Sequence, residues 1–347
     1  MRGEARDQLR ERVGRPAPGP DGVRHRPRGR GDHLALQFLR DGELHRRLGA
    51  KAVFADISLR CYNLDPADVL KKITPRTKAI IPVHLYGQAA DMAPWLDEAK
   101  RRGIRVIEDA AQAIGAHYRG RPVGGFGDVG CFSFFPSKNL GGFGDGGLMT
   151  ANDDALAEKL RVLRVHGGKP KYYHNLLGVN SRLDTVQAAL LRVKLPHLDG
   201  WAAARARNAA LYTKLLVEAG IATPSQGCNG CTHEASDEAG MAPLILPAAC
   251  QSRHVYNQFV VRTRIPAARD RLRDHLQKAG VGTEIYYPVP LHLQKCFAAW
   301  GYKAGDLPRA EKAAASTLAL PIFPELTEAE IREVVRCLGG FDWRGAE

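Results

Sequence analysis

The stretch GGFGDVGCFSFFPSKNLGGFGDGGLMT, residues 124–150, decides the fold and centres on one lysine, Lys138. An apolar run at 129–135 is typical of a buried strand, and Pro136 ends it. A glycine-rich segment, 141–147, follows the lysine and leaves room for a bulky group. A lysine kept away from water there would be a nucleophile toward aldehydes. The same residues also fit an exposed lysine in a glycine-rich hairpin, so this stretch alone leaves both interpretations open.

On both sides of this stretch, short apolar segments alternate with amphipathic ones. Strands are expected at residues 52–57, 78–82 and 105–108, and helices at 65–73, 92–102 and 153–165. Strands that alternate with helices predict an α/β fold with a mostly parallel sheet. Functional residues of such sheets lie at the carboxyl ends of strands, which is where Asp109 and Gln112 fall.

The second half of the chain predicts a smaller α/β domain. Ser181, three residues before Asp184, indicates a capped helix start, and a long helix is expected at 199–219. Beyond that helix we expect strands at 255–264 and 281–287 and helices at 267–279, 308–318 and 328–338. The predicted parts are an aberrant or disordered segment (1–47), a large domain (48–205) and a small C-terminal domain (206–347).

The composition is that of a soluble globular protein, with 44% of the 347 residues hydrophobic and 25% charged. The net charge of +13 comes partly from residues 1–47, which hold twelve arginines and no lysine. No recognition motif accompanies that charge, so no nucleic-acid partner is expected. No apolar run has the length of a membrane span and no signal-peptide core is visible, which favours the cytoplasm.

The seven cysteines are an odd number in mostly apolar surroundings, which favours reduced thiols over a disulfide framework. Cys228 and Cys231, with His233, have the spacing of half a zinc site, and Cys250 is nearby. No second pair follows at a suitable spacing. We therefore expect no metal.

An acid at one strand end, a serine on a second strand and a lysine just beyond it are the set that pyridoxal phosphate requires. The lysine forms an imine, the acid keeps the ring nitrogen protonated and the hydroxyl helps to hold the phosphate. The spacing alone does not establish such a site, because Asp109 also fits a helix cap and Ser133 a core hydroxyl. A Rossmann oxidoreductase is disfavoured, since GFGDVG at 125–130 precedes a strand instead of joining a strand to a helix.

Several long motifs, in order, resemble the DegT/StrS family of nucleotide-sugar aminotransferases. They are IEDAAQAIGAHYRGRPVGGFGDVGCFSFFPSKNLGGFGDGG (107–147), HGG (166–168), YYH (172–174), GVNSRLDTVQAALLRVKL (178–195), YNQFVVR (256–262) and GTEIYYPVPLHLQ (282–294). The resemblance runs from about Gly49 to the C-terminus. It implies the fold of the type I pyridoxal-phosphate-dependent transferases and a homodimer with active sites at the interface.

The resemblance also assigns roles to individual residues. Lys138 would form the imine with pyridoxal 5′-phosphate and later move a proton to or from the substrate carbon. Asp109 would pair with the ring nitrogen, and Gln112 would lie beside the ring oxygen. The remaining candidates are Ser133 for the phosphate, Asn180 for the phosphate of the neighbouring subunit's cofactor, and Tyr173, His174, Tyr287 and His292 for the sugar nucleotide.

The implied reaction moves an amino group from an amino acid, by resemblance L-glutamate, to a ketone of a nucleotide-linked hexose. Such sugars serve surface polysaccharides and secondary metabolites. The amino-acid sequences of the motifs are most similar to those of members that act on 3-keto sugars, while a 4-keto sugar stays an open alternative. A dehydratase relative, in which the lysine is replaced, is disfavoured by Lys138.

Residues 1–47 have no helical or strand periodicity, so disorder is expected. Upstream of GAK (49–51), the family carries a glycine–serine/threonine turn that binds the phosphate and an aromatic residue that stacks on the ring. Neither is visible here. A reading frame shifted by one base permits a peptide that contains both, as SGNGSDAL and SPFSFFAT, and the nucleotide sequence of the gene tests this. Without these elements we expect poor cofactor binding, and the alternative function is a non-catalytic or cofactor-free relative.

Overall fold

The structure is a computed structural model that describes residues 6–9, 32–35, 50–223 and 242–343. Within these residues the larger sheet has seven strands, and β8, β5, β4, β2 and β3 run parallel in that order. Strand β9 pairs antiparallel with β8, and β1 with β9. The strands are β1 (Arg6–Leu9), β2 (Asp32–Ala35), β3 (Lys51–Val53), β4 (Thr77–Ile81), β5 (Arg105–Asp109), β8 (Val129–Ser133) and β9 (Gly147–Ala151). The predicted mostly parallel α/β sheet is confirmed.

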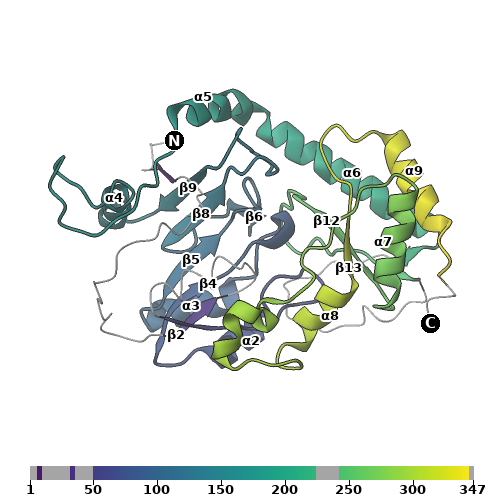
Figure 1. The fold of residues 1–347 in the computed structure, drawn as a ribbon, viewed down its shortest axis with the longest axis horizontal. Helices are drawn as coiled ribbons and strands as arrows, with labels where there is room; N and C mark the ends of the chain where they lie inside the picture. Colours follow the sequence, from purple (N-terminus) through teal and green to yellow (C-terminus); the bar gives the residue numbers. More distant parts are fainter. Residues whose placement is uncertain (1–5, 10–31, 36–49, 224–241, 344–347) are drawn as a thin grey trace.

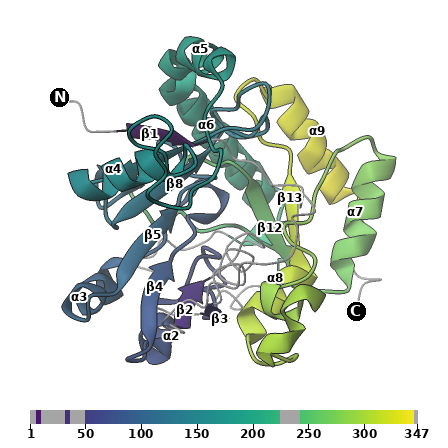
Figure 2. The ribbon, with the colours of Figure 1, turned by 60° about the vertical axis from the view of Figure 1, so that its left-hand side comes forward.

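Helices α2 (Pro66–Lys72) and α3 (Ala93–Arg101) lie side by side at the β4–β5 side of this sheet (Figures 1 and 2). Helix α2 begins where the sequence predicts, because the Asp65 carboxylate accepts the Ala67 N–H at 2.9 Å. Trp95 of α3 packs with Phe54, Ile80 and Val106 in one buried apolar cluster. The removal of these side chains from water stabilises the layer.

A second sheet of four strands has the order β10-β11-β12-β13. Its apolar cluster joins it to the long helix α6 (Leu198–Glu218), which runs from the large sheet toward the small one (Figure 1). The expected boundary between residues 205 and 206 falls inside α6 and stays a prediction. The elements of this part are β10 (Ala222–Thr223), β11 (Leu244–Ile245), β12 (Phe259–Thr263), β13 (Thr317–Leu320), α7 (Ala268–Lys278), α8 (Pro308–Ser316) and α9 (Glu328–Gly339).

Three expectations about the second half were wrong. Helix α8 ends at Ser316, and the apolar residues 317–320 form β13, which pairs antiparallel with β12 and is fully buried. The strand expected at 281–287 is reduced to one bridge between Glu284 and Ala319. Helix α5 (Thr185–Lys194) begins after Asp184, so Ser181 is not its cap. Burial in the sheet outweighs local helix propensity at 317–320, which is a tertiary effect.

Shorter elements complete the described chain. They are β6 (His117–Tyr118), β7 (Arg121–Pro122), α4 (Asp154–Leu163), and the 3-10 helices η1 (Leu85–Gly87), η2 (Leu195–His197), η3 (Leu291–Leu293) and η4 (Lys295–Trp300). The segment HLYGQ (84–88), expected to be a loop, contains η1. No helix of the described residues is long and apolar enough to cross a membrane.

Strands β1 and β2 lie within residues 1–47. These eight residues form strands, whereas disorder was expected for the whole segment. The rest of that segment lies outside the described residues, as do Cys228, Cys231 and His233. Cys250 is disulfide-bonded, which corrects the expectation of reduced thiols at this position. Within the described ranges, no group of three or more His, Cys, Asp or Glu side chains could hold a metal ion.

Candidate active site

The carboxyl ends of β5 and β8 bring the predicted acid, serine and lysine to one edge of the sheet. The two strands are parallel neighbours, with Asp109 opposite Cys131. Ser133 is the last residue of β8, and Lys138 follows five residues later. Parallel strands end on the same side of a sheet, so the edge predicted to carry function holds these three groups.

Asp109 is held by backbone bonds on both sides. Its N–H donates to the Pro82 carbonyl and its own carbonyl accepts the His84 N–H, both at 2.9 Å. Its Oδ1 accepts the Ala111 N–H at 2.9 Å, and the side chain is partly exposed. The carboxylate is therefore oriented from its own loop.

The lysine turn is built from backbone contacts. The Lys138 N–H donates to the Phe135 carbonyl at 2.9 Å, and the Ser133 hydroxyl accepts the Phe135 N–H at 3.2 Å. A Cβ on Gly141 would lie 2.2 Å from the Pro136 carbonyl oxygen, so the turn folds back this closely only with glycine there. Ser133 is buried and Lys138 partly buried.

Gln112 connects this edge to the η1 segment. Its Oε1 accepts the Tyr86 N–H at 2.7 Å, and its Nε2 lies 3.4 Å from the Tyr287 hydroxyl. The Tyr86 hydroxyl donates to the Tyr286 carbonyl. Burial, followed by the nearby tyrosines, raises the pKa of Tyr86 well above its ordinary value, so this hydroxyl stays protonated. Gln112 and Tyr287, both predicted site residues, are thus neighbours.

Asn139, which the sequence analysis did not single out, ties the lysine turn to the same segment. Its Nδ2 donates to the Val255 carbonyl at 3.0 Å, and the Val255 N–H donates to the Gly87 carbonyl at 2.9 Å. A chain of hydrogen bonds therefore runs from the residue beside Lys138, through Val255, to the loop that holds Gln112. The partner of Asn139 lies 116 residues away in the sequence, so no local pattern could indicate it.

Gly87 lies in this chain of hydrogen bonds at a position that has no room for a side chain. Its φ is +95°, and a Cβ would lie 2.9 Å from the Asn257 nitrogen and 2.9 Å from the Val255 side chain. We expect Gly87→Ala to lower the free energy of unfolding by about 1–3 kcal/mol, because it adds strain and a clash. Urea unfolding monitored by circular dichroism measures this loss.

Gly103→Ala is the matched control, since Gly103 has a φ of +65° but nothing within 4 Å of the added Cβ. It carries the conformational strain without the clash. Equal losses in the two variants would show that the close approach at Gly87 contributes nothing.

Glu108 lies on β5 beside Asp109 but is fully buried, so the two side chains face different surroundings. Its carboxylate accepts the N–H groups of Gly124, Phe126 and Gly127, each at 2.7 Å. Burial alone would raise the pKa of Glu108. The bonds from His84 and from these amides outweigh burial and hold the pKa below its ordinary value. Glu108 therefore fixes the loop that leads into β8.

His84 completes this buried pair. Its Nδ1 accepts the Ala90 N–H at 3.1 Å, so the ring proton is on Nε2, which donates to Glu108 at 3.0 Å. Successive side chains of a strand point to opposite faces of the sheet, so Glu108 is expected on the face away from Asp109. This alternation could have indicated a buried acid at position 108. His84 is the first residue of HLYGQ (84–88), which the sequence predicted only as a loop.

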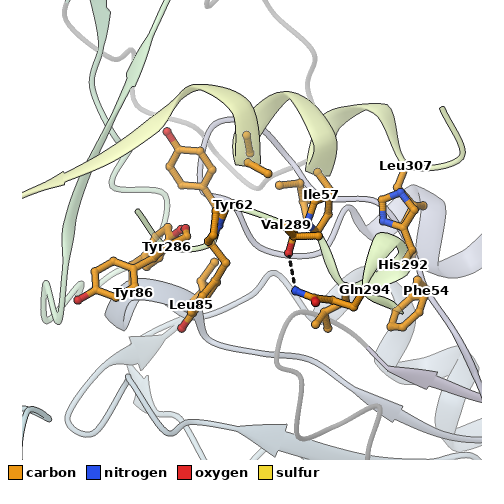
Figure 3. A pocket seen from close by; sticks show the side chains of 18 residues that line it. Phe54, Ile57, Tyr62, Leu85, Tyr86, Tyr286, Val289, His292, Gln294 and Leu307 are labelled. Carbon is orange, nitrogen blue, oxygen red and sulfur yellow. Dashed lines mark hydrogen bonds between the residues drawn. The ribbon is translucent and has the colours of Figure 1, made fainter. Parts of the chain in front are cut away.

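Tyr287 and His292 line a cavity of about 350 Å³ that is also lined by helix α8 and by the segments after β3 and β4 (Figure 3). His292 is 2% exposed, and its Nε2 lies 2.9 Å from the Glu311 carboxylate. Most of the lining is apolar or aromatic, including Phe54, Ile57 and Leu307. The two residues predicted to contact the sugar nucleotide therefore lie on one cavity.

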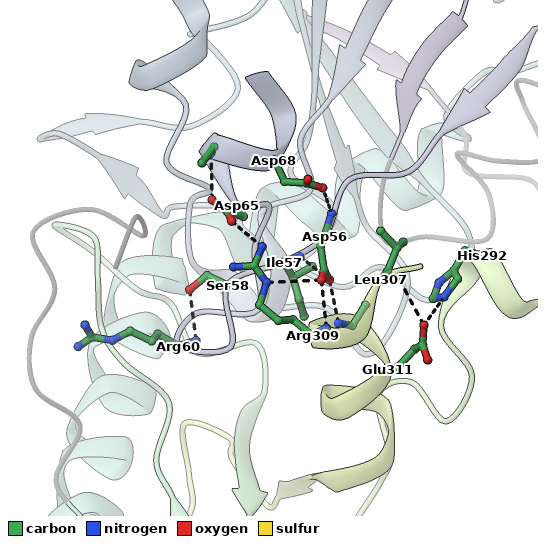
Figure 4. A network of polar contacts seen from close by, with 12 residues as sticks. Asp56, Ile57, Ser58, Arg60, Asp65, Asp68, His292, Leu307, Arg309 and Glu311 are labelled. Carbon is green, nitrogen blue, oxygen red and sulfur yellow. Dashed lines mark hydrogen bonds and ion pairs between the residues drawn. The ribbon is translucent and has the colours of Figure 1, made fainter. Parts of the chain in front are cut away.

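A polar network holds α8 against the large sheet beside this cavity (Figure 4). The Asp56 carboxylate accepts the N–H groups of Arg309 and Ala310, at 3.0 and 2.9 Å, in the first turn of the helix. The Arg309 guanidinium also pairs with Asp65 at 2.5 Å. Burial lowers the pKa of Arg309, but Asp65 and Asp56 raise it further, so the arginine stays charged. An acid at a helix N-terminus is electrostatically favourable. Asp56 in this position connects helix α8 to the large sheet.

Asn180, Tyr173 and His174 lie in the exposed segment between α4 and α5. Asn180 forms a bridge with Val165, and the His174 Nδ1 lies 3.1 Å from the His166 carbonyl. Large apolar side chains are exposed in and next to this segment: Phe143 (75%), Tyr172 (80%), Leu177 (85%), Val186 (70%) and Val193 (71%). Large apolar side chains exposed in one region of the chain are typical of a protein–protein interface.

An α/β fold with an acid at one strand end and a lysine just beyond the neighbouring strand is the arrangement expected of an aminotransferase of the pyridoxal-phosphate-dependent class. The chain belongs to the DegT/DnrJ/EryC1/StrS aminotransferase family, whose model matches residues 36–339. This confirms the family and fold class predicted from the sequence. The match begins before Gly49 and so includes residues that the sequence analysis assigned to the aberrant segment.

Individual relatives cover most of the chain. It is 49% identical over 317 residues to a "pleiotropic regulatory protein" of Geobacillus stearothermophilus, covering 90% of this chain and 79% of the relative. It is 42% identical to a UDP-N-acetyl-3-dehydro-alpha-D-glucosamine 3-aminotransferase of Acidithiobacillus ferrooxidans, over 88% and 76%. Among solved structures, S. venezuelae DesV in complex with a ketimine intermediate has a TM-score of 0.79 at 40% identity, over 90% and 78%.

The residues at this edge of the sheet match the groups that the ring and the carbonyl of pyridoxal phosphate require. The structure supplies an amine at Lys138, an oriented carboxylate at Asp109 and a hydroxyl at Ser133 on adjacent strand ends. These are the groups that the ring, the imine and part of the phosphate require. The segment upstream of residue 49, where the family carries its phosphate-binding turn and where the sequence shows none, lies outside the described residues except for 6–9 and 32–35.

Proposed function

We propose that this protein transfers an amino group from an amino acid, L-glutamate, to the keto group of a nucleotide-linked sugar, with pyridoxal 5′-phosphate. The observation that carries the proposal is the gathering of Asp109, Ser133 and Lys138 at the adjacent ends of β5 and β8. A 3-keto sugar is favoured, because the Acidithiobacillus relative is by name a 3-aminotransferase of a UDP-linked sugar. The product would serve a surface polysaccharide or a secondary metabolite.

Each predicted residue has a defined role in this proposal, and Lys138 has two. Asp109 holds the ring nitrogen protonated, Gln112 lies beside the ring, and Ser133 donates to the phosphate. The bound cofactor supplies an electron-withdrawing ring. Lys138 would hold the cofactor through its amine, which condenses with the cofactor's aldehyde and releases water, and it would then move the proton at the substrate carbon. Tyr287 and His292 contact the sugar nucleotide.

We infer that a second copy of this chain covers the apolar surface around α5. Asn180, Tyr173 and His174 lie in the exposed segment that leads into α5, and we propose that they serve the partner's site. Val186 and Val193 are 70% and 71% exposed there, which burial between two copies would remove from water.

Val186→Asp combined with Val193→Asp is therefore expected to convert the dimer to a monomer. Two buried carboxylates without partners oppose association by several kcal/mol. Sedimentation velocity measures the change, with Ala210→Asp on the exposed side of α6 as the control. A wild-type monomer, or a double variant that stays dimeric, would contradict the proposed interface.

Borohydride reduction after incubation with pyridoxal phosphate tests the function. A pyridoxyl adduct located on Lys138 by peptide mass spectrometry, together with amino transfer from L-glutamate, supports the proposal. The second candidate, a cofactor-free relative, is favoured by the expected absence of the phosphate-binding turn. It predicts no adduct and no visible absorbance band.

A further inference from the structure

Helix α5, at the top of Figure 1, has two faces with different surroundings. Val186 and Val193 are exposed on one face, which the proposed second copy would cover. Gln187, Leu191 and Lys194 follow the spacing of a second face, where Leu191 is buried and the two polar side chains are partly buried. This inner face therefore packs against the rest of its own chain.

Two polar side chains of the inner face hold the glycine-rich segment 141–147. The Gln187 Oε1 accepts the Phe143 N–H at 2.8 Å. The Lys194 ammonium donates to the carbonyl of Gly141, which is a buried residue. Both bonds reach back from α5 to the segment that follows the candidate lysine.

Glycines in this segment make room for Gln187. A Cβ on Gly142 would lie 2.8 Å from the Gln187 Oε1, and one on Gly144 would lie 3.2 Å from its Nε2. A segment rich in glycine loses much conformational freedom on folding and gains little side-chain packing in return. Its position therefore depends on bonds from outside the segment, and α5 supplies two of them.

The segment in turn fixes the turn that carries Lys138. The Phe134 carbonyl accepts the Gly142 N–H at 2.7 Å. Leu191 of α5 packs with Phe134 and Leu140, which lie on either side of Lys138 in the sequence, in one buried apolar cluster. Both ends of the lysine turn are thus tied to the inner face of α5.

Resting on the proposed function, we propose that Gln187 and Lys194 are positioning residues for Lys138. They act through the segment 141–147, which they fix against α5, and so hold the Lys138 amine where it meets the aldehyde of the cofactor. Orientation of a reacting group supplies a large part of catalysis, and a misplacement of about 1 Å can lower a rate about 10²-fold. The inner face of α5 thereby supports the candidate active site, separately from the interface on its outer face.

Two aldehydes of different size test the position of Lys138. Pyridoxal phosphate with borohydride requires an amine in place, whereas formaldehyde with cyanoborohydride methylates any amine that water reaches. In Gln187→Ala, the Lys138 pyridoxyl adduct at a subsaturating concentration is expected to fall about 5-fold, the effect of one lost hydrogen bond. Methylation of Lys138, measured against the exposed Lys214 of the same molecule, is expected to rise by up to about 5-fold, because the released turn opens to water. Peptide mass spectrometry measures both.

Three further variants separate the bonds from the helix itself. Lys194→Met keeps a long side chain but removes the donor to a buried carbonyl, so it should change both measurements in the same directions and at least as much. Gln187→Glu keeps an acceptor for the Phe143 N–H and should retain the wild-type values. Arg192→Ala is the matched control, because Arg192 is exposed on the same helix and alanine favours the helix at either position.

A purely structural role of these side chains gives a different result. It lowers the urea midpoint of unfolding but leaves the ratio of Lys138 to Lys214 methylation in the folded protein unchanged, which would overturn the positioning role. A loss of adduct that Gln187→Glu or Arg192→Ala shares would overturn it too. Sedimentation velocity should be the same for all these variants and the wild type. A variant that dissociates would trace its loss to assembly and contradict the proposal.

The outcomes also distinguish this role from the proposed function. A normal Lys138 adduct and normal amino transfer in the wild type, Gln187→Ala and Lys194→Met would sink the positioning role and leave the function standing. A wild type that forms no adduct would sink the function. Methylation of Lys138 then decides alone: a rise in both variants supports the hold of α5 on the lysine turn, and an unchanged ratio overturns it.

Discussion

Replacement of Lys138 by alanine is expected to abolish the borohydride-trapped pyridoxyl adduct and to lower amino transfer by about 10³-fold or more. Lys138 is the amine just beyond β8, beside the strand end that carries Asp109. It is proposed both to hold the cofactor and to move the substrate proton, and removal of a group with either task alone costs about 10²–10⁴-fold. The adduct is measured by peptide mass spectrometry and the transfer by glutamate consumption.

Lys214→Ala is the matched control, because Lys214 lies on α6 with an exposed side chain paired to Glu218. It should keep both the adduct and the rate of the wild type. An adduct on another lysine of the Lys138→Ala variant, with the rate unchanged, would remove Lys138 from the mechanism. A wild type that forms no adduct would favour the cofactor-free alternative.

The sequence predicted those parts of the site that are local in the chain. Asp109 and Lys138 each follow an apolar strand, and parallel strands end on one edge, so their proximity followed from the strand pattern. The family resemblance supplied the roles. The same reasoning predicted α2 from Asp65 and Pro66, because a helix cap is a contact between near neighbours.

Contacts between distant segments could not be predicted in this way. The sequence predicts a helix at 308–318, but residues 317–320 pair with β12, and that pairing joins segments about sixty residues apart. The bond from Asn139 to Val255 and the cap that Asp56 provides to α8 are likewise long-range. Periodicity reports on which face of an element is apolar, but not on which distant polar group meets it.

Glu108 is the residue whose replacement should cost the most stability. Its carboxylate holds three backbone amides and His84 in a site with no exposed surface. Glu108→Gln leaves a single acceptor oxygen and turns an amide NH₂ toward these donors. Each buried donor left without an acceptor costs about 1–3 kcal/mol, so the variant is expected to unfold at much lower urea concentration.

The pH dependence separates the charge of Glu108 from its shape. Its pKa is lowered in the folded state, so the carboxylate stabilises the fold above its unfolded-state pKa, and this contribution is lost as the pH falls through the folded-state pKa. The difference in unfolding free energy between wild type and Glu108→Gln should therefore be largest near neutral pH and shrink below about pH 4.5. Glu328→Gln, which removes one exposed ion pair with Arg332, should change the unfolding free energy by less than about 1 kcal/mol. A Glu108→Gln loss that is small, or that stays constant as the pH falls, would mean that the buried carboxylate does not hold the loop between β5 and β8.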